Sequence, residues 1–175
     1  MSNKTTKNSS QNQALIICYS YHHHNTEKIA KVFANKLKAP LKTPLQIKPE
    51  EIEQYSLIGF GSGIYSAKHH KSILDFVDRI PPVSNKKAIV FSTDGSPRFF
   101  TKYDSSLEKK QMKKNHQILN NKLKEKGFKI IGEFNCAGFN TNSFLKFFGG
   151  INKRRPNSDD LEKAKKFAYS LKEYR

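Results

Sequence analysis

The chain has 175 residues, 36% of them hydrophobic, and it contains 13 Phe and 7 Tyr. This length and composition predict one folded domain with a sizeable core and exclude a wholly disordered chain, because disordered chains lack such aromatic content. No apolar run is long enough to span a bilayer and the first residues lack the apolar core of a secretion signal, so we expect a cytoplasmic protein.

The formal net charge is +17, from 32 Lys and Arg against 15 Asp and Glu. Two interpretations compete: a surface for an anionic partner, or a Lys- and Asn-rich composition spread around the molecule. The second is the simpler one, because basic residues are scattered along the chain and the dense run at 109–114 has no interleaved aromatic residues that could stack on bases. Nucleic acid is therefore not an expected partner.

Strands and helices alternate along the chain after a polar start. Residues 1–13 are low in apolar content, and we expect a disordered N-terminal tail there. Strands are predicted from Ala14, weakly at 45–47, and at 56–60, 87–91 and 129–134; helices are predicted at 26–38, 68–79, 104–126 and 158–173. This alternation predicts a mostly parallel sheet covered by helices on both faces. Residues 137–156 lack periodicity, which is typical of functional loops or of loops strapped down by their own apolar side chains.

The most informative stretch is 14–30, where a short apolar run gives way to polar residues and then to a helix. The turn between them lies at the carboxyl end of a buried strand, where free helix N–H groups and the positive end of the helix dipole favour an anion. The hydroxyls of Ser20 and Thr26 and the amide of Asn25 add donors. One or two of the imidazoles of His22, His23 and His24 are predicted to donate to a phosphate here.

The segment Tyr-Ser-x-x-x-x-Asn-Thr-Glu-Lys-Ile-Ala at 19–30 resembles the FMN-phosphate loop and first helix of the flavodoxin family. Three later segments are similar to that family in the same order: 57–65, 88–95, and 149–157 leading into Asp160 and Leu161. The chain departs from the family pattern where Tyr21 and His24 replace small residues and Ser20 lies one place early. We infer a loop one residue longer than usual.

The resemblance implies an α/β flavodoxin-like three-layer sandwich with a five-stranded parallel sheet in the order 2-1-3-4-5. It also implies an FMN-binding domain at 14–175, with FMN at the carboxyl ends of strands one and three. In the family, a glycine carbonyl contacts N5 of the flavin, and in this chain Gly61 or Gly63 would supply that carbonyl. The ring of Tyr65 would lie against one face of the flavin. The other face could be covered by Phe99, Phe100 or Tyr103. The predicted cofactor-binding residues are Ser20, His22, His23, His24, Asn25, Thr26, Gly61, Ser62, Gly63, Ile64, Tyr65, Ser92, Thr93, Asp94 and Gly95.

Other chemistries are less well supported by the residues. The side chains of consecutive histidines at 22–24 point in different directions in a loop, so we expect no metal site there, even if His69 and His70 added ligands. We expect His69 and His70 to cap or flank a helix, or to face solvent. No triad, paired-carboxylate site, Walker loop or zinc motif is present, so no catalytic residues are predicted. Cys18 and Cys136 are expected to be buried free thiols.

The leading functional hypothesis is an FMN-binding, flavodoxin-like redox protein that passes electrons to a partner protein or a small-molecule acceptor. A small FMN-dependent NAD(P)H or quinone oxidoreductase is the first alternative; the lack of a nicotinamide-binding motif favours the carrier. A flavin-free basic module that binds nucleic acid or an anionic membrane is the second alternative.

Overall fold

The computed structural model describes residues 13–96 and 105–174. The predicted tail, apart from residue 13, and the predicted ring-covering residues Phe99, Phe100 and Tyr103 lie outside this part of the chain. The strands are β1 (Ala14–Tyr19), β2 (Leu41–Lys42), β3 (Leu57–Tyr65), β4 (Lys68–His69), β5 (Lys87–Asp94) and β6 (Lys129–Ala137). The helices are α1 (Asn25–Leu37), η1 (Pro49–Gln54), α2 (Lys71–Arg79), α3 (Ser105–Glu125), η2 (Ser143–Phe148), α4 (Ser158–Ser170) and η3 (Lys172–Tyr174).

The sheet order is β2-β1-β3-β5-β6, and all neighbours in this path are parallel. These five strands have the predicted order 2-1-3-4-5, so the fold prediction is confirmed. One strand was not predicted: β4 pairs antiparallel with the end of β3 and makes a short hairpin.

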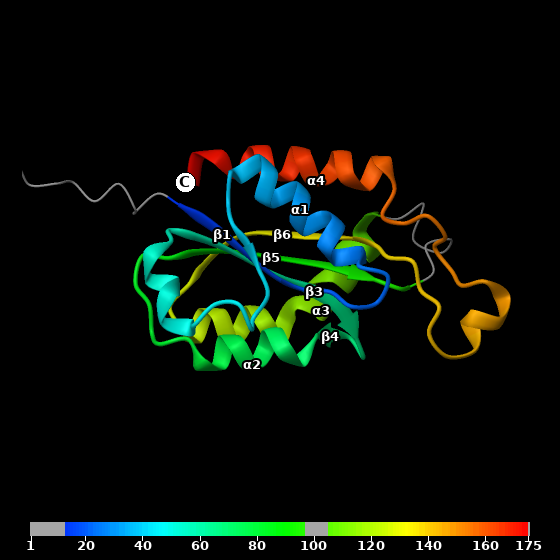
Figure 1. Ribbon diagram of the computed structural model, residues 1–175, viewed down its shortest axis with the longest axis horizontal. Coiled ribbons are helices and arrows are strands. Elements are labelled where there is room, and N and C mark those ends of the chain that lie inside the picture. Colours follow the sequence, from blue (N-terminus) through cyan, green and yellow to red (C-terminus); the bar gives the residue numbers. More distant parts are fainter. Residues whose placement is uncertain (1–12, 97–104, 175) are drawn as a thin grey trace, which may run out of the picture.

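Two helical layers cover the sheet, as Figure 1 shows, with α1 and α4 on one face and α2 and α3 on the other. The alternation of side chains along each strand separates two buried clusters. On the α1 and α4 face, Phe33 packs with Phe91 and Phe134. On the α2 and α3 face, Phe60 packs with Phe128. The result is the predicted three-layer sandwich.

The second strand is not at 45–47, where it was predicted, but at Leu41–Lys42. Prolines at 40 and 44 bound this short strand, and the carbonyl of Pro40 accepts the backbone N–H of Ile16. Leu45 is 91% exposed, whereas Ile47 is buried in the core on the α2 side. The apolar residues at 45–47 were therefore misread, because only one of them turns inward.

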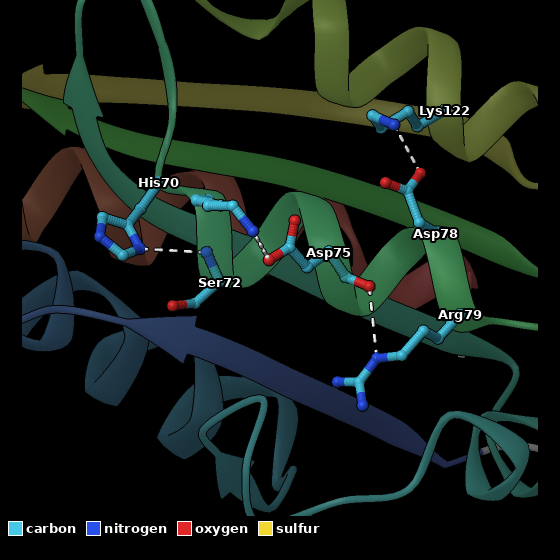
Figure 2. A network of polar contacts seen from close by, with 7 residues as sticks. His70, Ser72, Asp75, Asp78, Arg79 and Lys122 are labelled. Atoms are coloured by element: carbon cyan, nitrogen blue, oxygen red, sulfur yellow. Dashed lines mark hydrogen bonds and ion pairs between the residues drawn. The ribbon is translucent and has the colours of Figure 1, made fainter.

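Helix α2 begins three residues later than predicted, because β4 takes part of the expected helix. The imidazole of His70 accepts the backbone N–H of Ser72 and so caps the helix, which is one of the roles expected for His69 and His70. Figure 2 shows this cap, and it shows Asp78 farther along the helix paired with Lys122 of α3. The cap fixes where α2 starts, directly after the hairpin that ends β3.

Candidate functional site

A polar cavity lies at the carboxyl ends of the parallel strands, where β1 leads into α1. Its solvent-accessible volume is about 50 Å³. A single water needs roughly 10–15 Å³ on this measure, so the enclosed space takes a group of a few heavy atoms and not a three-ring system. The lining residues are Ser20, His22, Asn25, Thr26, Gly63, Ile64, Tyr65, Thr93, Asp94, Gly95, Gly138, Phe139, Asn140 and Asn142.

The turn between β1 and α1 enters the helix through two left-handed residues, His23 and His24, with φ of 53° and 51°. His24 is the N-cap residue, but its side chain makes no cap bond, because the ring nitrogen Nδ1 lies 2.8 Å from a carboxylate oxygen of Glu27. The first intrahelical bond runs from the N–H of Lys28 to the carbonyl of His24. The preceding amides have no partner within the helix, so they are available to an anion in front of them.

Two buried side chains of the first helical turn hold the neighbouring segments in place. The hydroxyl oxygens of Thr26 and Thr93 lie 2.7 Å apart, which joins α1 to the end of β5. The amide nitrogen of Asn25 donates to the carbonyl of Phe139 at 2.8 Å, which joins α1 to the segment after β6. The amide oxygen of Asn25 is buried and has no partner among the described residues. These contacts bring three separate segments to one cavity.

The three consecutive histidines have different surroundings, and only His22 lines the cavity. Its Nε2 accepts the backbone N–H of Thr141 at 3.3 Å. The pKa of His22 is lowered below its ordinary value, mainly by partial burial and secondly by the proximity of His23. His23 places Nε2 2.8 Å from the Thr141 hydroxyl and packs its ring on Phe139. The imidazoles of His22 and His23 thus fasten the segment after β6, while His24 turns away to Glu27.

The predicted glycine turn after β3 is a continuation of the strand, so that part of the prediction is wrong. Gly61 is buried between β1 and β5, and a Cβ there would lie 2.2 Å from the ring of Phe91. Ser62 is also buried, and its hydroxyl bonds to the ring of His69. Neither residue lines the cavity. Gly63 does, together with the two residues after it.

Tyr65 ends β3 at the edge of the cavity and stacks on Tyr21. The two ring centroids are 5.6 Å apart with an interplanar angle of 13°. Tyr21 is 54% exposed, whereas the aromatic rings of the core are buried. The pKa of the Tyr65 phenol is raised, mainly by burial and secondly by the proximity of Tyr21. In this arrangement the ring of Tyr21 covers one flat face of Tyr65.

Strand β5 also runs further than predicted, through Asp94, so the expected turn at 92–97 begins later. Ser92 is fully buried on the α3 side of the sheet, away from the cavity, with its hydroxyl 2.8 Å from Nε2 of His116. Ser92 also donates to Asn135 of β6 at 3.1 Å, and Asn135 in turn donates to the carboxylate of Asp94 at 2.8 Å. A buried polar chain therefore orients Asp94, which lines the cavity.

The far end of this chain reaches the edge strand β6. Nδ1 of His116 lies 2.8 Å from the carboxylate of Glu133, which also accepts from Asn120 at 3.0 Å. Partial burial of Glu133 raises its pKa, but the hydrogen bonds from His116 and Asn120 outweigh this effect and lower it overall.

Four lining residues were not predicted: Gly138, Phe139, Asn140 and Asn142. They follow β6, in the long segment without periodicity that the sequence marked as functional or strapped down. Asn140 and Ile151 exchange two backbone hydrogen bonds of 3.0 and 2.9 Å, which close the base of this segment. Repeated Asn after a buried strand was the available indication, but one sequence does not show how close these Asn residues come to the turn between β1 and α1.

The remaining histidines and cysteines do not form a metal centre in the part of the chain that the structure describes, where no group of three or more His, Cys, Asp or Glu could hold an ion. His69 is buried and not solvent-exposed, contrary to its simplest expected role. Cys18 and Cys136 are buried, as predicted. Within the described ranges, no helix combines the length and apolar character that a membrane crossing needs.

Comparison with known proteins agrees with this architecture. A family model described as flavodoxin domain matches residues 16–136, so the chain belongs to the flavodoxin domain family, and the resemblance seen in the sequence is confirmed. Family and fold together support a flavodoxin-like redox protein. An uncharacterized protein of Methanocaldococcus jannaschii is 49% identical over 159 residues, which cover 91% of this chain and 97% of that protein.

Two solved structures show the same fold at low sequence identity. Oxidised flavodoxin 2 from Bacillus cereus matches with a TM-score of 0.63 and 22% identity, over 92% of this chain and 98% of that one. A flavodoxin from the domain Archaea matches with a TM-score of 0.63 and 16% identity, over 92% of this chain and 96% of that one.

Proposed function

We propose that residues 14–175 form an FMN-binding domain and that the protein is an electron carrier. The observation that supports this most is the meeting of three segments at one polar cavity: the first turn of α1, the end of β3 and the end of β5. In flavodoxins the same three places hold FMN, which is what the sequence resemblance implied.

The enclosed part of the cavity fits the phosphate of FMN. Its volume of about 50 Å³ suits a group of that size. The free amides at the start of α1 supply donors, and the hydroxyl of Ser20 has no hydrogen-bond partner among the described residues. Among the titratable neighbours, His22 has a lowered pKa and is a neutral donor or acceptor near pH 7, not a fixed cation.

The flavin ring would lie outside that enclosed space, against Gly63, Ile64, Tyr65 and the Thr93–Gly95 backbone. Tyr21 now covers one face of Tyr65, so Tyr21 has to leave that face before a planar ring can stack there. At 54% exposure, Tyr21 has less buried surface to give up on moving than a core aromatic ring has. Asp94, oriented by Asn135, is the acidic group of this part of the site.

Bound FMN would supply the uptake and release of electrons. The residues of this chain bind and orient the cofactor, and none of them takes part in covalent chemistry in this proposal. The charge of +17 favours an electron-transfer partner with an acidic docking face or a small anionic acceptor. A cytoplasmic location belongs to the same proposal.

The test is a fluorescence titration of flavin-free protein with FMN and with riboflavin, which lacks the phosphate. We expect FMN to bind more tightly than riboflavin. Because a hydrogen bond to a charged group is worth about 1.5–3 kcal/mol, Ser20→Ala should weaken FMN binding roughly 10- to 100-fold and leave riboflavin binding unchanged. Ser84→Ala is the matched control, because Ser84 is exposed between α2 and β5, at the other end of the sheet.

Binding of neither flavin at micromolar concentration would reject the proposal and favour the flavin-free alternative. Equal binding of FMN and riboflavin would reject the phosphate site alone. The FMN-loaded protein is then mixed with NADH or NADPH under anaerobic conditions. Slow or absent oxidation supports a carrier, whereas rapid oxidation would make the protein an oxidoreductase.

A further inference from the structure

Residues 138–155, which we call the distal loop, leave β6 and return to the start of α4. Figure 1 shows this loop standing out from the body of the domain, at the end of the sheet where the strands finish. The reciprocal backbone bonds of Asn140 and Ile151 close its base, and the amide of Asn152 donates to the carbonyls of Ser96 and Gly138. The loop therefore has a defined anchor and a projecting tip, η2.

The tip presents two adjacent aromatic side chains to solvent. Phe147 and Phe148 are each 77% exposed, whereas Phe33, Phe60, Phe76 and Phe91 are fully buried in the core. Leaving two Phe rings in water forgoes the stabilisation that burial would give, so a loop with only a structural role gains nothing from them. The ammonium of Lys146 lies 5.0 Å from the centroid of the Phe147 ring and still reaches solvent.

Positive charge surrounds these rings without any compensating acid nearby in sequence. No Asp or Glu occurs from 134 to 158, while Lys146, Lys153 and Arg154 are exposed. Arg155 differs from them, because its guanidinium is paired with the buried carboxylate of Asp160. Neither Lys153 nor Arg154 has an ion pair with a residue that the structure describes.

We propose that the distal loop docks the protein on an anionic lipid surface, with Phe147 and Phe148 entering the acyl boundary and the basic side chains meeting the headgroups. Aromatic residues beside Lys and Arg are the usual composition of interfacial membrane segments. Protein interfaces are depleted in Lys at their centre, whereas exposed Lys and Arg beside apolar side chains suit the headgroup region of a membrane, so a bilayer fits these observations better than a protein does. Asn140 and Asn142, at the base of the loop, line the cavity, so docking holds the cavity beside the lipid.

The chain contains no Trp, which permits a direct test. Phe148→Trp introduces one tryptophan at the tip, and Leu45→Trp introduces one at another exposed apolar position, between β2 and η1. We expect vesicles of phosphatidylcholine with 30% phosphatidylglycerol to shift the Phe148→Trp emission to shorter wavelength. Vesicles of phosphatidylcholine alone, and the Leu45→Trp protein in either lipid, should give no shift.

Co-sedimentation with the same vesicles measures affinity. The double variant with Phe147→Ser and Phe148→Ser should bind anionic vesicles at least about tenfold more weakly than the unchanged protein. A double charge reversal in the distal loop, Lys153→Glu with Arg154→Glu, should weaken vesicle binding. A control double charge reversal on α3, Lys110→Glu with Lys114→Glu, changes the net charge by the same amount and should weaken binding less.

Equal losses from the two charge reversals, or unchanged binding by the double Phe variant, would overturn the proposal in favour of diffuse electrostatic adsorption. Absence of any emission shift with anionic vesicles would overturn it in favour of a protein partner. None of these readouts depends on a flavin, so the proposal stands or falls separately from FMN binding.

Discussion

The stability of the fold is expected to fall in mild acid because of one buried histidine, His69. Its side chain is 1% exposed, Nδ1 lies 3.0 Å from the hydroxyl of Ser62, and Nε2 is buried without a partner among the described residues. The ring of His116 is 5.0 Å away. Burial, and next the charge of His116, holds the pKa of His69 well below its ordinary value of 6.5.

The sign of the effect follows from proton binding in the two states. In the unfolded chain this imidazole takes up a proton as the pH falls through about 6.5, whereas the folded protein keeps it neutral. The unfolded state therefore binds more protons, and the free energy of unfolding falls as the pH falls, until the folded pKa is reached. For one proton, the loss between pH 6.5 and 5.5 is about 1 kcal/mol, or about 2–4 °C in Tm for a domain of this size.

Urea unfolding of the unchanged protein and of His69→Gln at pH 5.5, 6.5 and 7.5 measures this directly. The variant is expected to be less stable at pH 7.5, because a packed ring is lost. Between pH 6.5 and 5.5, however, it should lose about 1 kcal/mol less than the unchanged protein. His23→Gln serves as the control, since His23 is exposed and its Nε2 faces the hydroxyl of Thr141 and not a charged group. Parallel curves for the unchanged protein and His69→Gln would refute the reasoning.

Three further substitutions test the packing by urea unfolding. Phe33→Ala should destabilise the fold by about 3–5 kcal/mol, because the ring is fully buried on the α1 and α4 face; a loss below 1 kcal/mol would contradict the described core. Asn157→Ala should lower the free energy of unfolding by about 1 kcal/mol, because Asn157 caps α4 by accepting the N–H of Asp160. An unchanged urea midpoint would mean that this cap does not stabilise the fold. Gly61→Ala should cost about 1–3 kcal/mol, since its Cβ would meet the ring of Phe91, and no loss would show that this ring can move.

The sheet could be predicted because its strands carry continuous apolar runs separated by amphipathic helices. The run at Leu15–Ile17 and the helix face at Ile29 and Phe33 are clear in the sequence, and they fix the layers. The second strand could not be located, because it has only two residues, and its position depends on the pairing of Ile16 with Leu41 across the sheet.

The ends of the strands were misplaced for one physical reason. Ser62, Ser92 and Asn135 are polar, and polar residues after an apolar run usually mark a loop. Here each is paired inside the protein, and His69 and His116 supply two of the partners. Tertiary hydrogen bonds of this kind cannot be seen in one sequence. The same limitation hid Asn140, whose place in the site depends on a backbone pairing across the distal loop.

The buried chain behind Asp94 also ties the cavity to the far edge of the sheet. Asn135 donates its amide nitrogen to Asp94 and accepts the hydroxyl of Ser92. That hydroxyl oxygen lies 2.8 Å from Nε2 of His116, whose Nδ1 lies 2.8 Å from the carboxylate of Glu133. Two carboxylates, one at the cavity and one on β6, are therefore joined by an unbroken row of hydrogen-bonded side chains, so a substitution at His116 also disturbs the acidic group that lines the cavity.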